Sequence, residues 1–110
     1  MAYDTDLADR LRSILSGEPD VVEKRMFGGL AFLVAGHLAV SASSQGGLLL
    51  RVDPASSNAL TSDPRVSLFE MRGRSMAGWL HVDIDGSVTG EELTAWVKRG
   101  VAMVRSLPPR

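Results

Sequence analysis

Apolar residues along the chain follow two different periods, and the change from one to the other predicts the secondary structure. Near the start they lie at i, i+4, i+7 and i+8, the spacing of one helical face; they are Leu7, Leu11, Ile14 and Leu15. Asp4 or Thr5 can cap this helix, and Gly17 is placed to end it. The pattern therefore predicts an amphipathic first helix that buries one face.

From residue 21 onward the apolar residues come in short runs separated by turn residues, which is typical of strands. The runs cover residues 21–25, 30–34, 37–43 and 48–52. Between the last three runs, Ala35-Gly36 and the segment 44–47 leave room only for tight turns. Because antiparallel strands can be joined by such short turns, we expect a meander here.

The second half of the chain alternates helix and strand signals. Asp53-Pro54 has the sequence of a helix start and predicts a short helix through Leu60. Polar and apolar positions then alternate in two further segments, which predicts two more strands. We expect these strands at residues 66–71 and 78–84. A loop at residues 72–75 lies between them, and a turn at residues 85–86 follows the second strand.

The last segment carries the clearest helix signals. Thr89 and Glu92 form a T-x-x-E capping box, and Pro108 stands where the helix should end. The apolar stripe comprises Leu93, Trp96, Val97, Val101 and Val104, with Gly100 on the same face. Gly inside a helix costs about 1 kcal/mol relative to Ala, so we expect close packing at Gly100. The elements together predict an α+β fold, with an antiparallel sheet of about four to six strands flanked by an N-terminal helix, a short middle helix and a long C-terminal helix.

Composition indicates one small domain and removes several kinds of chemistry. The 110 residues fit a single domain over residues 1–110. The absence of cysteine excludes disulfides, thiolate catalysis and thiolate-bound metals, and only His37 and His81 could supply imidazole. The formal net charge of −1 argues against a surface that is basic overall. The acidic start of the chain is unlike a signal peptide, so we expect a soluble cytoplasmic protein with no cofactor.

Two adjacent glycines form the first candidate binding site. Gly28-Gly29 lies beside Arg25 and can form a nest of backbone N–H groups for an anion. The same glycines can simply shape a bulge or a tight strand entry. No G-x-G-x-x-G pattern accompanies them, which disfavours dinucleotide binding.

Basic residues that flank strands and loops form the second candidate; they are Lys24, Arg25, Arg51, Arg65, Arg72 and Arg74. If these residues converge, they can bind phosphate or carboxylate. Otherwise they form a solvated rim, with Arg51 paired to Asp53 or Glu70. Trp79 either forms a contact surface with Arg72 and Arg74 or packs under the last helix.

The spacing of polar residues shows no catalytic set. No serine lies in a G-x-S-x-G elbow, and His81 with Asp83 is a weak general-base pair. Residues 81–92 match most of a calcium loop, but His81 stands where Asp is required and a strand precedes it in place of a helix. Because an Asp-Gly turn and a capping box explain the same residues, we expect no metal and no catalytic residue.

Three sequence blocks resemble, in their order, the N-terminal domain of the TfoX/Sxy family, bacterial proteins named for a competence regulator. They are Arg25-Met26-Phe27-Gly28-Gly29, Leu49-Leu50-Arg51-Val52-Asp53 and the segment from Met71 to Trp79. The resemblance runs from about Leu7 to Leu107 and implies an α+β fold with an antiparallel sheet. It also implies a regulatory setting, because the longer members resemble co-activators of a DNA-bound transcription factor. Those members carry a further C-terminal domain, and we expect this chain to act without one.

Three hypotheses of function follow. We expect a non-enzymatic protein-interaction domain, with a transcription- or competence-related role implied by the resemblance, a protein partner such as a transcription factor, and a homodimer or larger homo-oligomer. Nucleic-acid binding through an arginine surface is one alternative, and a binder or enzyme for a small anionic ligand is another. The expected binding residues are Arg25, Gly28, Gly29, Arg51, Arg72, Arg74 and Trp79.

Overall fold

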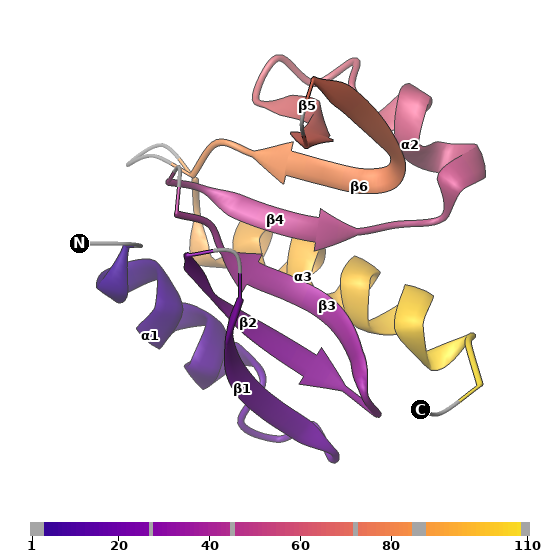
Figure 1. Ribbon diagram of the computed structural model, residues 1–110. Helices are drawn as coiled ribbons and strands as arrows, with labels where there is room; N and C mark the ends of the chain where they lie inside the picture. The colour runs from indigo at the N-terminus through magenta and orange to yellow at the C-terminus, as the bar shows by residue number, and fades with distance from the viewer. Residues whose placement is uncertain (1–3, 27, 45, 72, 85–87, 109–110) are drawn as a thin grey trace.

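The computed structural model describes residues 4–26, 28–44, 46–71, 73–84 and 88–108 and shows one sheet with helices against it (Figure 1). The elements in chain order are α1 (Thr5–Ile14), β1 (Val21–Met26), β2 (Gly29–Val34), β3 (His37–Ala42), β4 (Leu48–Arg51), α2 (Pro54–Leu60), β5 (Val66–Met71), β6 (Arg74–Val82) and α3 (Gly90–Arg105). The sheet has six strands, and all neighbouring strands are antiparallel. The predicted α+β class and the three flanking helices are confirmed.

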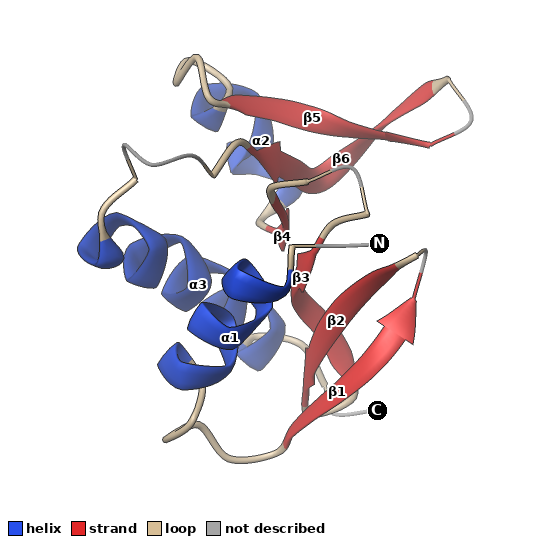
Figure 2. Ribbon diagram, turned by 90° about the vertical axis from the view of Figure 1, so that its left-hand side faces the viewer, coloured by secondary structure: helices blue, strands red, loops and turns tan. Residues whose placement is uncertain are grey.

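The strand order places the second half of the chain in a way that the sequence does not reveal. The sheet runs β1-β2-β3-β4-β6-β5, so the first four strands form the expected meander. β6 then pairs with β4, which leaves β5 at the edge. The β5–β6 hairpin projects away from α1 and α3 (Figure 2). Because β6 lies beside β4, Arg51 comes directly opposite Trp79.

The helix starts are those predicted from the capping residues. The Asp4 side chain accepts hydrogen bonds from the backbone N–H groups of Asp6 and Leu7, and Asp53 caps α2 in the same way. Both halves of the Thr89–Glu92 capping box are present. α1 ends at Ile14, before the predicted Gly17, because the chain already turns there. None of the helices in the described ranges is long and apolar enough to cross a membrane.

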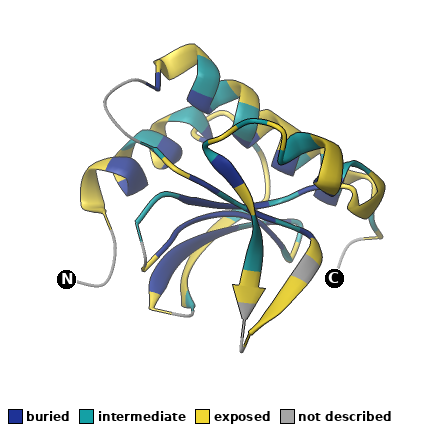
Figure 3. Cartoon of the chain, turned by 90° about the horizontal axis from the view of Figure 1, so that it is seen from above, coloured by how far each residue is buried: buried dark blue, intermediate teal, exposed yellow. Residues whose placement is uncertain are grey.

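The core lies between one face of the sheet and the helices (Figure 3). α3 packs on β3, β4 and β2, and it buries Leu93, Val97, Gly100 and Val104. A Cβ on Gly100 would lie 2.8 Å from both the Ala39 carbonyl oxygen and a Leu50 methyl carbon. The predicted close packing at Gly100 is therefore confirmed, and it sets the distance between α3 and the sheet.

The segment predicted as a loop at 72–75 is the one clear error in the secondary structure. Arg74 and Ser75 belong to β6 and pair with Met71 and Glu70. Gly73, at φ 78°, adopts the positive φ that a tight hairpin turn requires, so the strand resumes directly after it. β6 ends at Val82, two residues earlier than predicted. Arg72 and the predicted turn at residues 85–86 lie outside the described residues.

Candidate functional site

One face of the sheet has no helix over it in the described structure (Figure 2). Successive side chains of a strand point to opposite faces. Leu50 and Leu80 belong to the core beneath α3, so their neighbours Leu49 and His81 point to the other side. We call this other side the helix-free face and define it by Ser41, Leu49, Arg51, Trp79 and His81. Its centre is closely packed, since Ser41 and Leu49 are only 3% and 5% exposed.

Arg51 and Trp79 form the most distinctive contact on the helix-free face. They are cross-strand partners on β4 and β6, and the Arg51 guanidinium carbon lies 5.1 Å from the centre of the Trp79 ring. This is the geometry of a cation–π contact between two half-buried side chains. Within the described residues Arg51 makes no ion pair with Asp53 or Glu70. Trp79 lies on the opposite side of the sheet from α3, so the alternative that it packs under the last helix is wrong.

The backbone around this pair depends on glycine. Gly78 precedes Trp79 and has a φ of 87°, which L side chains rarely adopt. It lies against the end of β4, where the Val52 N–H donates to the Gly78 carbonyl oxygen at 2.8 Å. A Cβ here would also lie 3.0 Å from the Pro54 ring. Gly78 therefore lets the middle of β6, next to Trp79, pack against the β4–α2 connection.

The other predicted binding residues do not converge on Arg51. Arg25 is exposed on β1, which is separated from β4 by β2 and β3, or about three strand spacings of ~4.8 Å. Arg74 is exposed at the start of β6, beside the hairpin turn. Arg72 lies outside the described residues. Among the described side chains of the predicted set, Arg51 and Trp79 are the two that the structure brings into contact.

Gly28 and Gly29 have structural explanations. Gly28 has a φ of 76°, as the turn between β1 and β2 requires. A Cβ on Gly29 would collide with the Ala42 carbonyl oxygen of β3. The two glycines therefore allow the tight strand entry and the close backbone approach that were the alternative to an anion nest.

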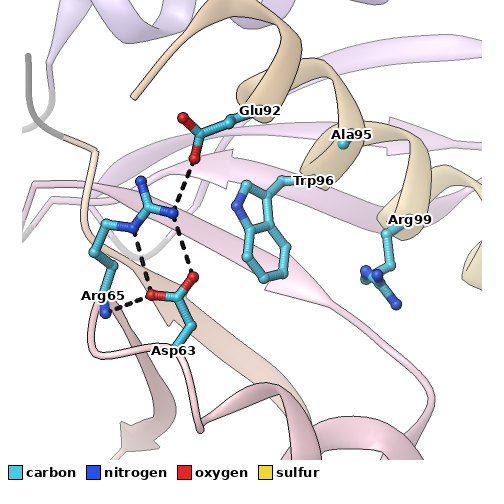
Figure 4. Close-up of a pocket in the computed structure, with 6 residues that line it drawn as sticks. All are labelled: Asp63, Arg65, Glu92, Ala95, Trp96 and Arg99. Carbon is cyan, nitrogen blue, oxygen red and sulfur yellow. Dashed lines mark hydrogen bonds and ion pairs between the residues drawn. The ribbon is translucent and has the colours of Figure 1, made fainter. Parts of the chain in front are cut away.

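Sequence reasoning missed a pocket of about 260 Å³ between the α2–β5 connection and α3 (Figure 4). It is lined by Asp63, Arg65, Glu92, Ala95, Trp96 and Arg99. The sequence indicates Arg65 only as a basic rim residue, Glu92 only as a cap and Trp96 only as part of the apolar stripe. The spacing does not show that the α2–β5 connection meets the first turn of α3, so no local signal could have revealed the pocket.

Arg65 joins the two elements that form this pocket. Its Nη2 donates to Glu92 Oε2 at 2.9 Å and to Asp63 Oδ2 at 3.3 Å. These hydrogen bonds lower the pKa of both carboxyl groups below their ordinary values. On the other side of the pocket, the Arg99 guanidinium carbon lies 5.8 Å from the centre of the Trp96 ring. Arg65 alone thus bridges the two carboxylates, and Arg99 lies against Trp96. We call the contact of Asp63, Arg65 and Glu92 the latch, because it fixes the α2–β5 connection to α3.

The polar residues offer no metal site in the described part of the chain. No group of three or more His, Asp or Glu side chains there is placed to hold an ion. His81 is used structurally, since its Nε2 lies 2.6 Å from the Gly46 carbonyl oxygen and ties β6 to the β3–β4 turn. His37 makes a similar 2.6 Å contact with the Pro108 carbonyl oxygen.

Fold and surface together define a small α+β domain with one helix-free sheet face. The family model for the TfoX N-terminal domain matches residues 13–104, and the chain therefore belongs to this family. This match confirms the resemblance carried by the three sequence blocks. Searches among curated proteins and among solved structures found no match.

Proposed function

We propose that this chain is a non-enzymatic protein-interaction domain with a regulatory role, and that it binds its partner through the helix-free face. The observation that carries this proposal is the contact between Arg51 and Trp79, at 5.1 Å, on a face without a helix. Trp and Arg are among the residues most enriched at the positions that dominate protein–protein binding energy. The stacked pair is also already ordered, which reduces the entropy lost on binding.

A protein partner fits the charges of the molecule better than a nucleic acid does. The net charge is −1, and Arg25 lies across the sheet from Arg51. A phosphate backbone needs several cations along one track, which this spacing does not supply. Membership of the TfoX N-terminal domain family supports a regulatory partner, such as a transcription factor.

Affinity purification with matched variants tests the proposal. Tagged wild type, Trp79→Ala and Arg51→Ala are recovered from a native lysate, with and without nuclease. We expect a discrete protein partner that survives nuclease and binds Trp79→Ala about 30-fold more weakly, the effect of losing about 2 kcal/mol at a central interface residue.

Arg99→Ala is the matched control, because Arg99 also stacks on a tryptophan but lies on α3. It should bind the partner as the wild type does, and circular dichroism should show all variants folded. A partner that binds folded Trp79→Ala and Arg51→Ala with unchanged affinity would rule out this surface. Recovery of nucleic acid, or partners lost on nuclease treatment, would favour the nucleic-acid alternative instead.

A further inference from the structure

We propose that two copies of this chain pair through β1, edge to edge, and join their sheets into one continuous antiparallel sheet. β1 is the first strand in the sheet order and pairs on one side only, with β2. The N–H and C=O groups on the other side of an edge strand form a template for a further strand. This surface is distinct from the Arg51–Trp79 contact, so the two proposals stand or fall separately.

The exposure of β1 sets it apart from the other strands. Its four central residues, from Val22 to Arg25, are all exposed. Val22 is 60% exposed, and it is the only large hydrophobic residue among the described ones that is mainly exposed to solvent. A hydrophobic residue in this position gains from being covered by a partner.

The charges along β1 complement those of a second copy in one register. A two-fold axis perpendicular to the sheet keeps each face on the same side, so partners must be residues whose side chains share a face. With the axis at Lys24, Glu23 lies opposite Arg25 of the second copy, and Val22 lies opposite Met26 of the second copy. Each of these pairs occurs twice by symmetry. Opposite charges and apolar side chains placed directly across from each other stabilise antiparallel pairing.

Neighbouring registers are worse. An axis at Glu23 would place two glutamates together and would set Val21 opposite Arg25. An axis at Arg25 would place two arginines together and would set Lys24 opposite Met26. The Lys24 register has a single like-charged pair, and the long lysine side chains can splay apart along the helix-free side.

The ion pair that Glu23 forms with Arg12 in its own chain is compatible with this dimer. Arg12 binds Glu23 through two hydrogen bonds, of 2.6 and 2.8 Å. An ionised carboxylate has about four acceptor positions, so a second guanidinium can also bind it. Arg12 thereby holds the carboxylate in place for Arg25 of the second copy.

Charge reversal gives a sharp test by sedimentation equilibrium over a range of concentrations. Wild type should show a monomer–dimer equilibrium. Glu23→Arg and Arg25→Glu alone should each raise the dissociation constant about tenfold or more, because two favourable cross-strand pairs become repulsive. An equimolar mixture of the two variants should form a heterodimer with near-wild-type affinity, since at both cross-strand pairs an arginine of one variant then faces a glutamate of the other.

Controls separate this effect from a general loss of charge balance or of folding. Glu91→Arg and Lys98→Glu make the same kinds of charge change at exposed positions of α3 and should leave the dissociation constant unchanged. Lys24→Gln removes the like-charged pair, keeps the Arg12–Glu23 contact, and should tighten the dimer several-fold. The Lys24→Gln variant therefore tests the β1 pairing even where a charge reversal disturbs folding.

Three results would overturn the proposal. The first is a wild-type chain that remains monomeric up to about 1 mM. The second is a dimer whose dissociation constant is the same in the folded charge-reversal variants, which would place the interface elsewhere. The third is a Lys24→Gln variant that dimerises no more tightly than wild type.

Discussion

Single glycines fix how closely the layers of this domain approach. Gly100 brings the backbone of α3 against β3, where a Cβ would lie 2.8 Å from the Ala39 carbonyl oxygen. A backbone oxygen cannot move aside as the end of a flexible side chain can, so α3 itself would have to shift. The absence of a methyl group at Gly100 therefore determines the spacing between helix and sheet.

We expect Gly100→Ala to lower the free energy of unfolding. Overpacking a tight core costs about 1–3 kcal/mol, which exceeds the gain in helix propensity of about 1 kcal/mol where the contact is with backbone. Urea denaturation at pH 7 measures the change. Gly17→Ala is the control, because a Cβ there would meet nothing within 4 Å, and its effect should stay within about 0.5 kcal/mol. A Gly100→Ala variant as stable as wild type would show that α3 can move freely on the sheet.

The pair of Arg51 and Trp79 shows how far a residue-level prediction can reach. Both residues could be singled out from the sequence as binding candidates, Arg51 as a basic residue that flanks a strand and Trp79 as an aromatic residue of the kind that favours interfaces. Their contact could not be predicted, because it depends on β6 pairing with β4, which leaves β5 at the edge of the sheet. The local sequence does not show which of these two strands pairs with β4. Arg25 belonged to the same candidate set, and the strand order places it across the sheet.

At the level of elements, local signals were sufficient wherever a cap or a period defined the boundary. Thr89, Asp53 and Asp4 each cap the helix that the sequence predicts. The prediction of where β6 starts was wrong, because Arg74 and Ser75 are polar and follow a glycine, a pattern that is typical of a loop. Only the pairing of these residues with β5, which the local sequence does not show, makes them a strand.

The latch formed by Asp63, Arg65 and Glu92 connects elements whose contact the sequence did not reveal, and it predicts a pH dependence. In the folded state the pKa of both carboxyl groups lies below its ordinary value, which is 3.8 for Asp63 and 4.5 for Glu92. The unfolded state therefore binds more protons in acid, and the stabilisation is present above about pH 4.5 and is lost as the pH falls through the lowered pKa values.

Arg65→Gln removes the main cause of these shifts, the side-chain hydrogen bonds of Arg65. We expect this variant to be less stable than wild type at pH 7 and the difference to shrink as the pH falls below about 4. Urea denaturation at a series of pH values measures it. Arg99→Gln removes the same charge from the same pocket without breaking the latch, so its difference from wild type should be nearly independent of pH. An Arg65→Gln difference that is equally large in acid would contradict the assignment.

For the molecule as a whole, the β4–β6 pairing joins β1–β4 to the β5–β6 hairpin, and α3 adds a second connection between these two halves of the sheet. α3 contacts β2, β3 and β4 from the first half. Near its start Glu92 binds Arg65, which precedes β5. At its end Arg105 donates to the Glu18 carboxylate at 2.9 Å and to the Pro19 carbonyl oxygen at 2.8 Å, in the connection from α1 to β1. Because one helix is fixed to both halves, we expect the described elements to unfold as a single cooperative unit.

The two tryptophans allow that expectation to be measured, since Trp79 lies on β6 and Trp96 on α3. Trp79→Phe and Trp96→Phe each leave one indole as a fluorescence probe, of the helix in the first case and of the sheet in the second. The urea transition seen by fluorescence should coincide with that seen by far-UV circular dichroism in each variant, because neither layer is stable alone. Leu93→Ala, at a fully buried position of α3, should lower both midpoints together by an amount that corresponds to about 2–5 kcal/mol. If Trp96 instead reports an earlier transition than Trp79, then α3 detaches first and the sheet persists without it.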